Sequence, residues 1–544
     1  MRRFRLLPAS AALAVAGLSM IPLAARAGVY GCSLPTVNDR CESWATVYDD
    51  PAITQGSDQL EPRVAVSHDG SRVFVAAIDE ALNSSDPYNS PASWVVLAYD
   101  GHSGAQLWSS TYQSTGHYDR PNAITVSADG AAVYVTGGSY DAPLLESHDR
   151  DLVTIAYDAT TGAQRWRTRN VDANVHDVGT DIVSSPDGSQ VYVTVNIEKG
   201  GGEIDWAGEA YDATTGAVLW RTEYDGITTG VVNSPAGMAI SHDGRFVYIT
   251  GQSGGTTQFD LDYATVAYAT GGVQPGSVAW SSRYDGVGHQ YPDRPAGITV
   301  DADGRVVVTG DSISNFSTSV ADDFATVAYD GTTGAQLWAS RYSGPAGGVN
   351  FGMAVASSPS SALAVVTGQI EPSGKSGDTA WATLAYDTST GAQLWEQTLN
   401  TPEYSTQFPV AVAVTRDGND AVVTGYSGAR APTPLTPPVA GGDAVTVTYA
   451  LSGGAQQWIA RYSANLTDGN TPRALALSDE GDVFTTVQVA HDTQTDTSGS
   501  GNHYDIATMA YLAAPASDVP EGAPWWFATI ALCIAGAALF RVRR

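Results

Sequence analysis

The sequence predicts an all-β fold, a single eight-bladed β-propeller of four-stranded antiparallel blades. Three observations support this prediction. Tryptophan recurs at intervals of 54 to 64 residues, each interval contains four short segments of alternating apolar and polar residues, and the last repeat lacks one strand that the start of the chain supplies. A ring closed in this way has no long unpaired sheet edge.

The fifth repeat illustrates the expected blade, with strand A at 297–302, strand B at 305–310, strand C at 324–330 and strand D at 337–342. Alternation of apolar and polar residues is typical of half-buried strands. Asp-Gly separates A from B in six repeats, which predicts a tight turn with positive φ at the glycine. A glycine also lies four residues before the tryptophan in every complete repeat, where the C-to-D turn requires its backbone freedom.

The recurrent tryptophan of strand D is expected to dock between neighbouring blades, because a large apolar side chain on an outer strand needs such a contact to be buried. Stacking on sugars is the alternative role. The docking residues are Trp44, Trp108, Trp166, Trp220, Trp280, Trp338, Trp395 and Trp458.

The two ends of the repeat region complement each other. The eighth repeat has strands A, B and C at 473–479, 482–487 and 505–512, and no strand D follows. Residues 42–48 read ESWATVY, a tryptophan strand with no A, B or C before it. We therefore expect this first strand to pair with the last blade. An open solenoid, the alternative, would need capping repeats.

The phrase Ala-x-Asp-x-x-Thr-Gly-x-x-x-Trp at 156–166 resembles the tryptophan-docking repeat of eight-bladed propellers of the pyrroloquinoline-quinone (PQQ) type. The segments at 306–312 and 323–344 also resemble the bacterial SBBP propeller repeats, and together the motifs cover about 44–512. The resemblance implies the fold, which hosts many functions. Quinoproteins of this type commonly have two adjacent cysteines over the quinone and calcium-binding acids in the channel. This chain has no adjacent cysteines, so we predict no cofactor, disfavour PQQ and leave calcium open.

Residues 1–27 are expected to be a signal peptide, with basic residues before an apolar run and a small-x-small cleavage site before Gly28. A membrane-spanning helix is the alternative for this segment. Export places the segment 28–43 in an oxidising compartment, where Cys32 and Cys41 are expected to form a disulfide. The propeller is expected to occupy 44–512.

A linker at 513–524 precedes an apolar tail at 525–544 that ends in arginines. The region from about 519 onward resembles a PEP-CTERM sorting signal, although Pro520-Glu521-Gly522 departs from the Pro-Glu-Pro of that family. The tail is expected to be either a membrane anchor or a sorting signal that is removed. We therefore expect an exported protein of the cell envelope, the cell surface or the extracellular space.

The variable B-to-C and D-to-A loops are the expected binding face, because binding residues often lie on loops of a rigid frame. The long loops at 426–442 and 488–504 could equally be decoration. The D-to-A loops carry possible binding residues Tyr118, Arg120, Tyr291 and Arg294. Weak candidates for a metal site are His117, His176, His289, Asp260 and Asp262. Ordinary polar loop and turn residues are the alternative for all of them.

The net charge of −30 argues against nucleic acid as a partner. The expected partner of a monomeric propeller is a protein, a glycan or another envelope component, with membrane contact through the tail only. The sequence thus favours a binding module over an enzyme. The alternative is a PQQ-type oxidoreductase or another propeller enzyme such as a hydrolase or lyase.

Overall fold

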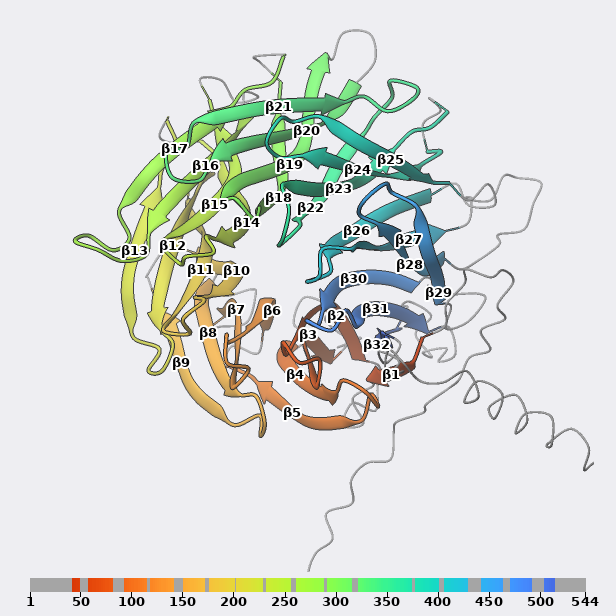
Figure 1. Ribbon diagram of the computed structural model, residues 1–544. Coiled ribbons are helices and arrows are strands. Elements are labelled where there is room, and N and C mark those ends of the chain that lie inside the picture. The colour runs from red at the N-terminus through yellow and green to blue at the C-terminus, as the bar shows by residue number, and fades with distance from the viewer. Residues whose placement is uncertain are drawn as a thin grey trace, which may run out of the picture.

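Eight four-stranded antiparallel blades surround a central axis in the computed structural model (Figure 1). In each blade the strands follow the order A, B, C, D from the axis outward, as the sequence predicts. The structure describes residues 42–48, 57–81, 92–114, 118–140, 150–171, 176–200, 202–227, 231–255, 261–287, 291–315, 321–373, 377–400, 406–428, 442–462, 470–491 and 503–513.

The strands of the first four blades come in chain order. Blade 1 has β2 (Ser57–Val66), β3 (Arg72–Ala81), β4 (Ala92–Asp100) and β5 (Gln106–Tyr112), and blade 2 has β6 (Asp119–Val126), β7 (Ala132–Tyr140), β8 (Arg150–Asp158) and β9 (Gln164–Asn170). Blade 3 has β10 (His176–Ser184), β11 (Gln190–Gly200), β12 (Glu203–Asp212) and β13 (Val218–Tyr224), and blade 4 has β14 (Asn233–Ile240), β15 (Phe246–Gly254), β16 (Leu261–Ala269) and β17 (Val278–Tyr284).

The other four blades continue the pattern until the last strand. Blade 5 has β18 (Asp293–Val300), β19 (Arg305–Asn315), β20 (Ala321–Asp330) and β21 (Gln336–Tyr342), and blade 6 has β22 (Phe351–Ser357), β23 (Leu363–Ile370), β24 (Ala380–Asp387) and β25 (Gln393–Leu399). Blade 7 has β26 (Thr406–Val414), β27 (Asp420–Gly428), β28 (Gly442–Ala450) and β29 (Gln456–Tyr462), and blade 8 has β30 (Asn470–Leu477), β31 (Val483–His491), β32 (His503–Tyr511) and β1 (Trp44–Tyr48).

The first strand of the chain closes the ring. Strand β1 pairs antiparallel with β32 in a continuous register from Trp44 opposite Ala510 to Tyr48 opposite Ile506. The backbone N–H of Ser43 extends the contact by donating to the carbonyl of Ala510 at 2.7 Å. Figure 1 shows β1 and β32 side by side, from opposite ends of the colour scale. The predicted closure is confirmed, and the solenoid alternative is wrong.

The A-to-B turns contain the expected glycine with positive φ. In blade 1, Gly70 has φ 67° and donates its N–H to the carbonyl of Ser67 at 2.8 Å. The Asp69 carboxylate accepts hydrogen bonds from the Ser67 hydroxyl and the Ser71 N–H. The strands resume only at Arg72, whose carbonyl accepts from Ser67 N–H at 3.0 Å, so the turn is longer than a two-residue hairpin loop.

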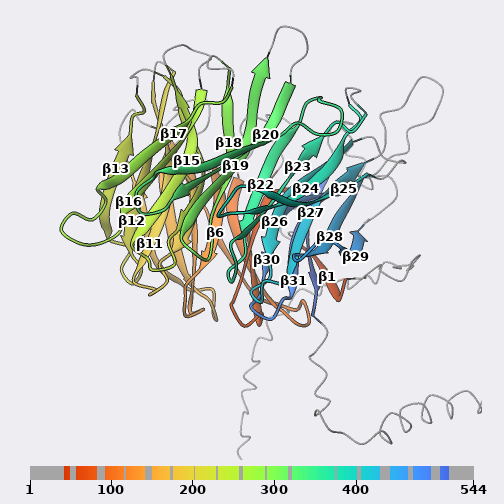
Figure 2. The same ribbon diagram turned by 45° about the horizontal axis from the view of Figure 1, so that its top comes forward.

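The two kinds of turn share one face of the ring. The N–H of Gly101 in a C-to-D turn donates to the carbonyl of Ser71 in the A-to-B turn of the same blade at 2.9 Å. The B-to-C and D-to-A connections therefore lie on the opposite face, and Figure 2 shows the strands crossing the ring from one face to the other. We call the first the turn face and the second the loop face.

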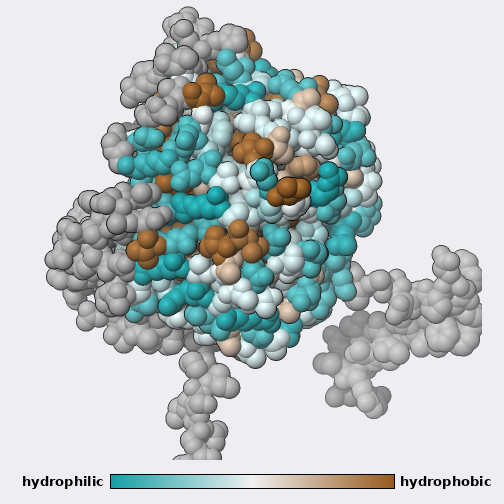
Figure 3. Space-filling model, turned by 90° about the vertical axis from the view of Figure 1, so that its left-hand side faces the viewer, coloured by the Kyte–Doolittle hydropathy of each residue, from teal (hydrophilic) through white to brown (hydrophobic). Residues whose placement is uncertain are grey.

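Each of the seven C-to-D pairs joined by a turn contains a β-bulge, where the register shifts beside the strand C tyrosine. A bulge on an outer strand discourages pairing with other chains. In several blades the residues before the tryptophan are exposed aliphatic groups, namely Leu107, Val218, Leu219, Val278, Leu337 and Leu394. Figure 3, which shows one side of the ring, has separate apolar patches within a largely hydrophilic surface.

No helix long and apolar enough to span a membrane occurs among the described residues. The predicted signal peptide, the predicted Cys32–Cys41 disulfide and the predicted tail at 525–544 lie outside the described residues.

Candidate functional site

The loop-face end of the blades carries a recurrent charge pair between strands C and D. The acid lies six residues before the strand C tyrosine, and the arginine lies three residues after the tryptophan. The pairs are Asp151–Arg169 at 2.6 Å, Asp262–Arg283 at 2.7 Å and Asp323–Arg341 at 2.8 Å. All three acids are buried. An acid paired in this way has a structural partner within its own blade.

Blades 1 and 3 support this interpretation. In blade 1 the two positions hold Ser93 and Thr111, so acid and arginine are absent together. In blade 3 Glu223 replaces the arginine, and Lys199 of β11 lies 2.9 Å from Asp205 and 3.0 Å from Glu223. The lysine thus supplies the positive charge that strand D lacks. We infer that these acids hold strands C and D together at the loop face.

A second recurrent polar group lies where the chain enters strand A in blades 2 to 8. Asp119 Oδ2 accepts a hydrogen bond from Ser114 N–H, and Asp293 Oδ2 accepts one from Gly286 N–H, both at 2.6 Å. These bonds tie the D-to-A loop to the strand that follows it. The equivalent residues are Asp119, Asp177, Asn233, Asp293, Asn350, Gln407 and Asn470, and all are at most 1 % exposed.

The structure brings three carboxylates together between blades 4 and 5. Ligand atoms of Asp262, Asp285 and Asp293 lie within 4.8 Å of one another. Oxygen ligands of this kind suit a hard cation such as calcium, but Arg283 already neutralises part of the charge through Asp262. The predicted metal candidate Asp262 belongs to this group, whereas Asp260 lies outside the described residues.

The buried carboxyl group of Asp293 makes the stability of the fold depend on pH. Burial, with a smaller contribution from the negative charge of Asp262, raises its pKa to about 6. A carboxyl whose pKa is higher in the folded state stabilises the fold below its unfolded pKa, and that contribution is lost as the pH rises through about 6. Asparagine fits the position, because Asn233, Asn350 and Asn470 occupy it in blades 4, 6 and 8.

We therefore expect Asp293→Asn to raise the free energy of unfolding by about 1 to 3 kcal/mol at pH 7 and to have little effect near pH 4. Chemical denaturation between pH 4 and pH 8 measures the difference. Asp158→Asn is the control of opposite sign, because hydrogen bonds from Arg165 and Thr161 lower the Asp158 pKa to about 2. A difference that does not change with pH would contradict the assignment.

The predicted loop residues pack against the frame. Tyr118 contacts Tyr140 edge to face, with ring centroids 5.2 Å apart. The Arg120 guanidinium lies 5.9 Å from the Tyr118 ring centroid, and its Nη2 lies 3.4 Å from Glu61 Oε1. The structure places these two predicted binding residues together, half-buried at the inner rim of blades 1 and 2.

The equivalent residues of blade 5 differ. Arg294 Nη1 lies 3.1 Å from Asp311 Oδ2, while Tyr291 is half-buried just before β18. Among the predicted histidines, His176 is described, and its Nδ1 accepts a hydrogen bond from Arg150 N–H at 3.4 Å. His117 and His289 lie outside the described residues, so the structure does not place the three-histidine group.

Charged residues that the sequence analysis did not single out lie on two inner strands. Arg63 of β2 donates from Nε to the carbonyl of Asn122 at 2.9 Å, and Asp181 of β10 accepts from Met238 N–H at 2.9 Å. Each side chain therefore makes a hydrogen bond to the backbone within the inner strand of the next blade. The register equivalents in the other blades are small, namely Ala123, Gly237, Gly297, Ala354, Ala411 and Ala474.

The pKa of Arg63 is lowered, mainly by burial. The positive charges of Arg473 and Arg120 act in the same direction, whereas the negative charges of Glu61 and Asp181 act in the opposite direction. Burial also raises the Asp181 pKa to about 6. Glu61 has φ 52°, and it is the one non-glycine residue with positive φ in the described part of the chain. Charged side chains of the inner strands thus lie close together around Arg63, in blades 8, 1, 2 and 3.

The described residues do not fit a planar quinone on the axis. Every tryptophan within the described ranges lies on strand C or strand D, because Trp94, Trp206 and Trp381 join the docking set as fully buried residues of strand C. None of the described inner strands carries an indole that could form a floor for the cofactor. We derive no chemistry through PQQ.

The repeated turn, the docking tryptophan and the eight blades define a β-propeller of the PQQ-like repeat class. The family model described as "Outer membrane protein assembly factor BamB" matches residues 92–263 and 209–481. The chain belongs to this family.

The chain is similar to several solved structures at low sequence identity. BamB from Moraxella catarrhalis is 17% identical, with 84% of this chain and 100% of that chain covered and a TM-score of 0.41. Sqt1 from Chaetomium thermophilum is 12% identical, covering 85% and 98%, with a TM-score of 0.46. A europium-containing methanol dehydrogenase is 12% identical, covering 87% and 94%, with a TM-score of 0.42. No curated protein sequence matches the chain.

Proposed function

We propose that this protein is an exported β-propeller of the cell envelope that acts as a binding module for an envelope protein. The observation that carries the proposal is that the chain belongs to a family whose model is described as "Outer membrane protein assembly factor BamB". An assembly factor acts on other proteins, which agrees with a rigid ring that presents loops on one face.

The construction of the loop face supports this role. Two recurrent features hold the ends of the blades in place: the charge pairs between strands C and D, and the buried polar residues at the start of strand A. The loops that connect these ends can therefore vary in sequence without destabilising the blades. Tyr118 and Arg120 add an amphipathic patch at the inner rim, and aromatic and arginine side chains commonly dominate protein interfaces. We assign partner binding to this face, with Tyr291, Arg294 and the long connections at 426–442 and 488–504 as further contacts.

The test uses the purified chain and one partner identified by cross-linking from the envelope fraction. In the variant, the connection 429–441 of blade 7 is replaced by the shorter connection 255–260 of blade 4. Loss of interface side chains is expected to weaken binding at least about tenfold. His102→Ala, an exposed change on the turn face, is the control and should bind like the wild type. Unchanged binding by both the loop variant and an Arg120→Ala variant would overturn the assignment of this face.

A second measurement separates the binding module from a quinoprotein. The purified chain is supplied with PQQ and calcium, and dye reduction is followed with alcohols and sugars as substrates. The proposal expects no reduction above the rate with free PQQ. Tight PQQ binding with substrate-dependent dye reduction would replace the binding module with an oxidoreductase.

A further inference from the structure

Two arginines of neighbouring inner strands bring their positive charges close together. Arg473 belongs to β30 of blade 8 and Arg63 to β2 of blade 1, and β2 follows β30 around the axis (Figure 1). Both side chains are partly exposed. Burial lowers the pKa of Arg63 most, and the positive charge of Arg473 lowers it as well. The two guanidinium groups therefore lie close enough to repel each other.

The repeat does not require either arginine. The other blades carry, at the position of Arg63, Ala123, Asp181, Gly237, Gly297, Ala354, Ala411 and Ala474. They carry, at the bulge position of Arg473, Pro62, Asn122, Thr180, Ala236, Ala296, Met353 and Val410. No other blade has a basic residue at either position. The pair of arginines is thus specific to the junction of blades 8 and 1.

Neutral groups hold the two side chains in place. Arg63 donates from Nε to the carbonyl of Asn122 at 2.9 Å and from Nη1 to the carbonyl of Glu61 at 3.3 Å. Arg473 donates from Nε and Nη2 to Gln488 Oε1, at 3.0 Å and 2.6 Å. Among the described residues, Arg63 Nη2 and Arg473 Nη1 have no hydrogen-bond partner, and neither side chain forms an ion pair. Each guanidinium group therefore keeps one nitrogen and its charge for a ligand.

The two nearby acids have other partners. Glu61 Oε1 lies 3.4 Å from Arg120 Nη2. The Asp181 carboxylate accepts hydrogen bonds from two backbone N–H groups, at 2.8 Å and 2.9 Å. The three arginines of this group exceed the two acids by one positive charge, although the whole chain has a net charge of −30. The inner wall at this junction therefore attracts an anion.

We propose that Arg63 and Arg473 together bind an oxyanion, a carboxylate or a phosphate group, on the inner wall of the ring. Arg63 Nη2 and Arg473 Nη1 are the donors, because a planar guanidinium group makes directional, charge-assisted hydrogen bonds to both kinds of oxyanion. The oxyanion belongs either to a free small molecule or to an acidic side chain of a bound protein. The two donors are not among the residues assigned to partner binding, so each proposal can fail without the other.

The test is calorimetric titration of the full chain at low salt with inorganic phosphate, with succinate and with Nα-acetyl-glutamate methylamide. We expect at least one of these anions to bind with a Kd of about 1 mM or tighter. The uncharged Nα-acetyl-glutamine methylamide should not bind. Arg63→Ala and Arg473→Ala should each weaken binding at least about tenfold through loss of a charge-assisted hydrogen bond.

Three further variants test the assignment. Asp181→Asn removes a neighbouring negative charge and should strengthen binding about threefold, which a merely destabilised ring would not do. Arg245→Ala removes an arginine whose side chain is 67% exposed on the turn face, and it should bind like the wild type. Arg473→Ala breaks hydrogen bonds within blade 8 alone and introduces the alanine of blades 4 and 5, so it remains a test if Arg63→Ala does not fold.

The source of the oxyanion follows from the order of affinities. Tighter binding of phosphate or succinate would identify a free anion, and tighter binding of the glutamate derivative would identify an acidic side chain of a protein. Absence of binding by all three anions would overturn the proposal. Equal affinities for the wild type and the folded arginine variants would also overturn it.

Discussion

Removal of residues 28–50 is expected to lower the free energy of unfolding by at least about 5 kcal/mol, a large part of the stability of an ordinary domain. The deletion takes away β1, so the pairing with β32 and the contact of Trp44 with blade 1 are lost together. Trp44 is 9% exposed, and its Nε1 donates to the carbonyl of Gly101 at 2.8 Å. Calorimetry and chemical denaturation measure the loss.

A chain lacking only residues 28–41 is the matched control, because it keeps β1 and should melt like the full chain. Trp44→Ala separates the indole from the strand and should lie between the two deletions. If the 28–50 deletion melts at the temperature of the 28–41 deletion, the first strand does not close the ring in solution.

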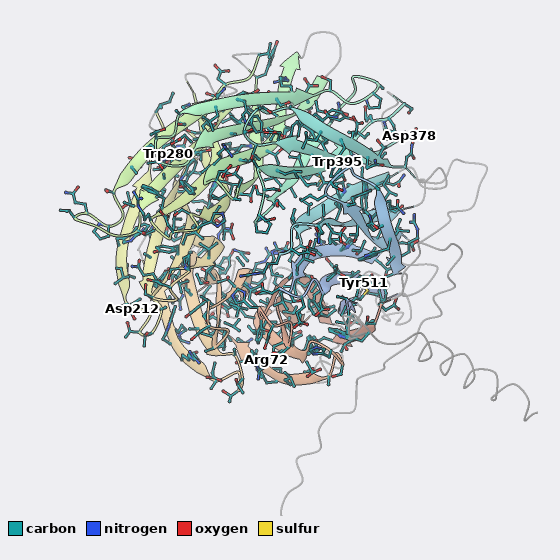
Figure 4. The ribbon with its side chains drawn as sticks, in the orientation of Figure 1. Arg72, Asp212, Trp280, Asp378, Trp395 and Tyr511 are labelled. Atoms are coloured by element: carbon teal, nitrogen blue, oxygen red, sulfur yellow. The ribbon has the colours of Figure 1, made fainter. Side chains whose placement is uncertain are left out.

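Trp280→Ala is expected to cost about 3 to 5 kcal/mol. The indole of Trp280 is 8% exposed and donates from Nε1 to the carbonyl of Gly331 in blade 5 at 2.9 Å. Its ring lies 6.2 Å from that of Tyr329 in the same neighbouring blade. Trp280, labelled in Figure 4, lies on an outer strand of the ring, so its truncation opens a cavity between blades 4 and 5.

Two variants show whether the loss comes from this contact. Trp280→Phe keeps an aromatic ring and should lose clearly less than the alanine variant. Leu337→Ala removes a side chain that is 46% exposed on β21 and should change stability by no more than about 0.5 kcal/mol. A loss with Trp280→Ala as small as that of Leu337→Ala would show that the tryptophan does not join the blades.

The amino-acid sequence alone was sufficient to predict the number of blades, the order of strands within a blade and the closure of the ring. Each of these follows from a pattern that is local or periodic: Asp-Gly turns, a glycine four residues before tryptophan, and a missing strand at one end matched by an extra strand at the other. Such patterns are readable because turn geometry and strand alternation depend on neighbouring residues.

The candidate site was only partly predictable. Asp262 was predicted as a weak metal candidate, but the sequence did not indicate that Asp285 and Asp293 lie beside it or that Arg283 pairs with it. A signal for the pair was present, since acid and arginine keep fixed distances from the tyrosine and tryptophan of their repeat. Recognising that the acid and the arginine form a pair required knowledge of the register between strands C and D.

Only the tertiary structure decided which residues meet across neighbouring blades. Arg63 reaches Asn122 in the next blade, and Asp262 of blade 4 meets Asp293 of blade 5. The physical reason is that periodicity specifies a blade, whereas contacts between blades depend on side chains brought together by the closed ring. The sequence by itself therefore determined the frame, and the packing of blade against blade determined which charged side chains come together.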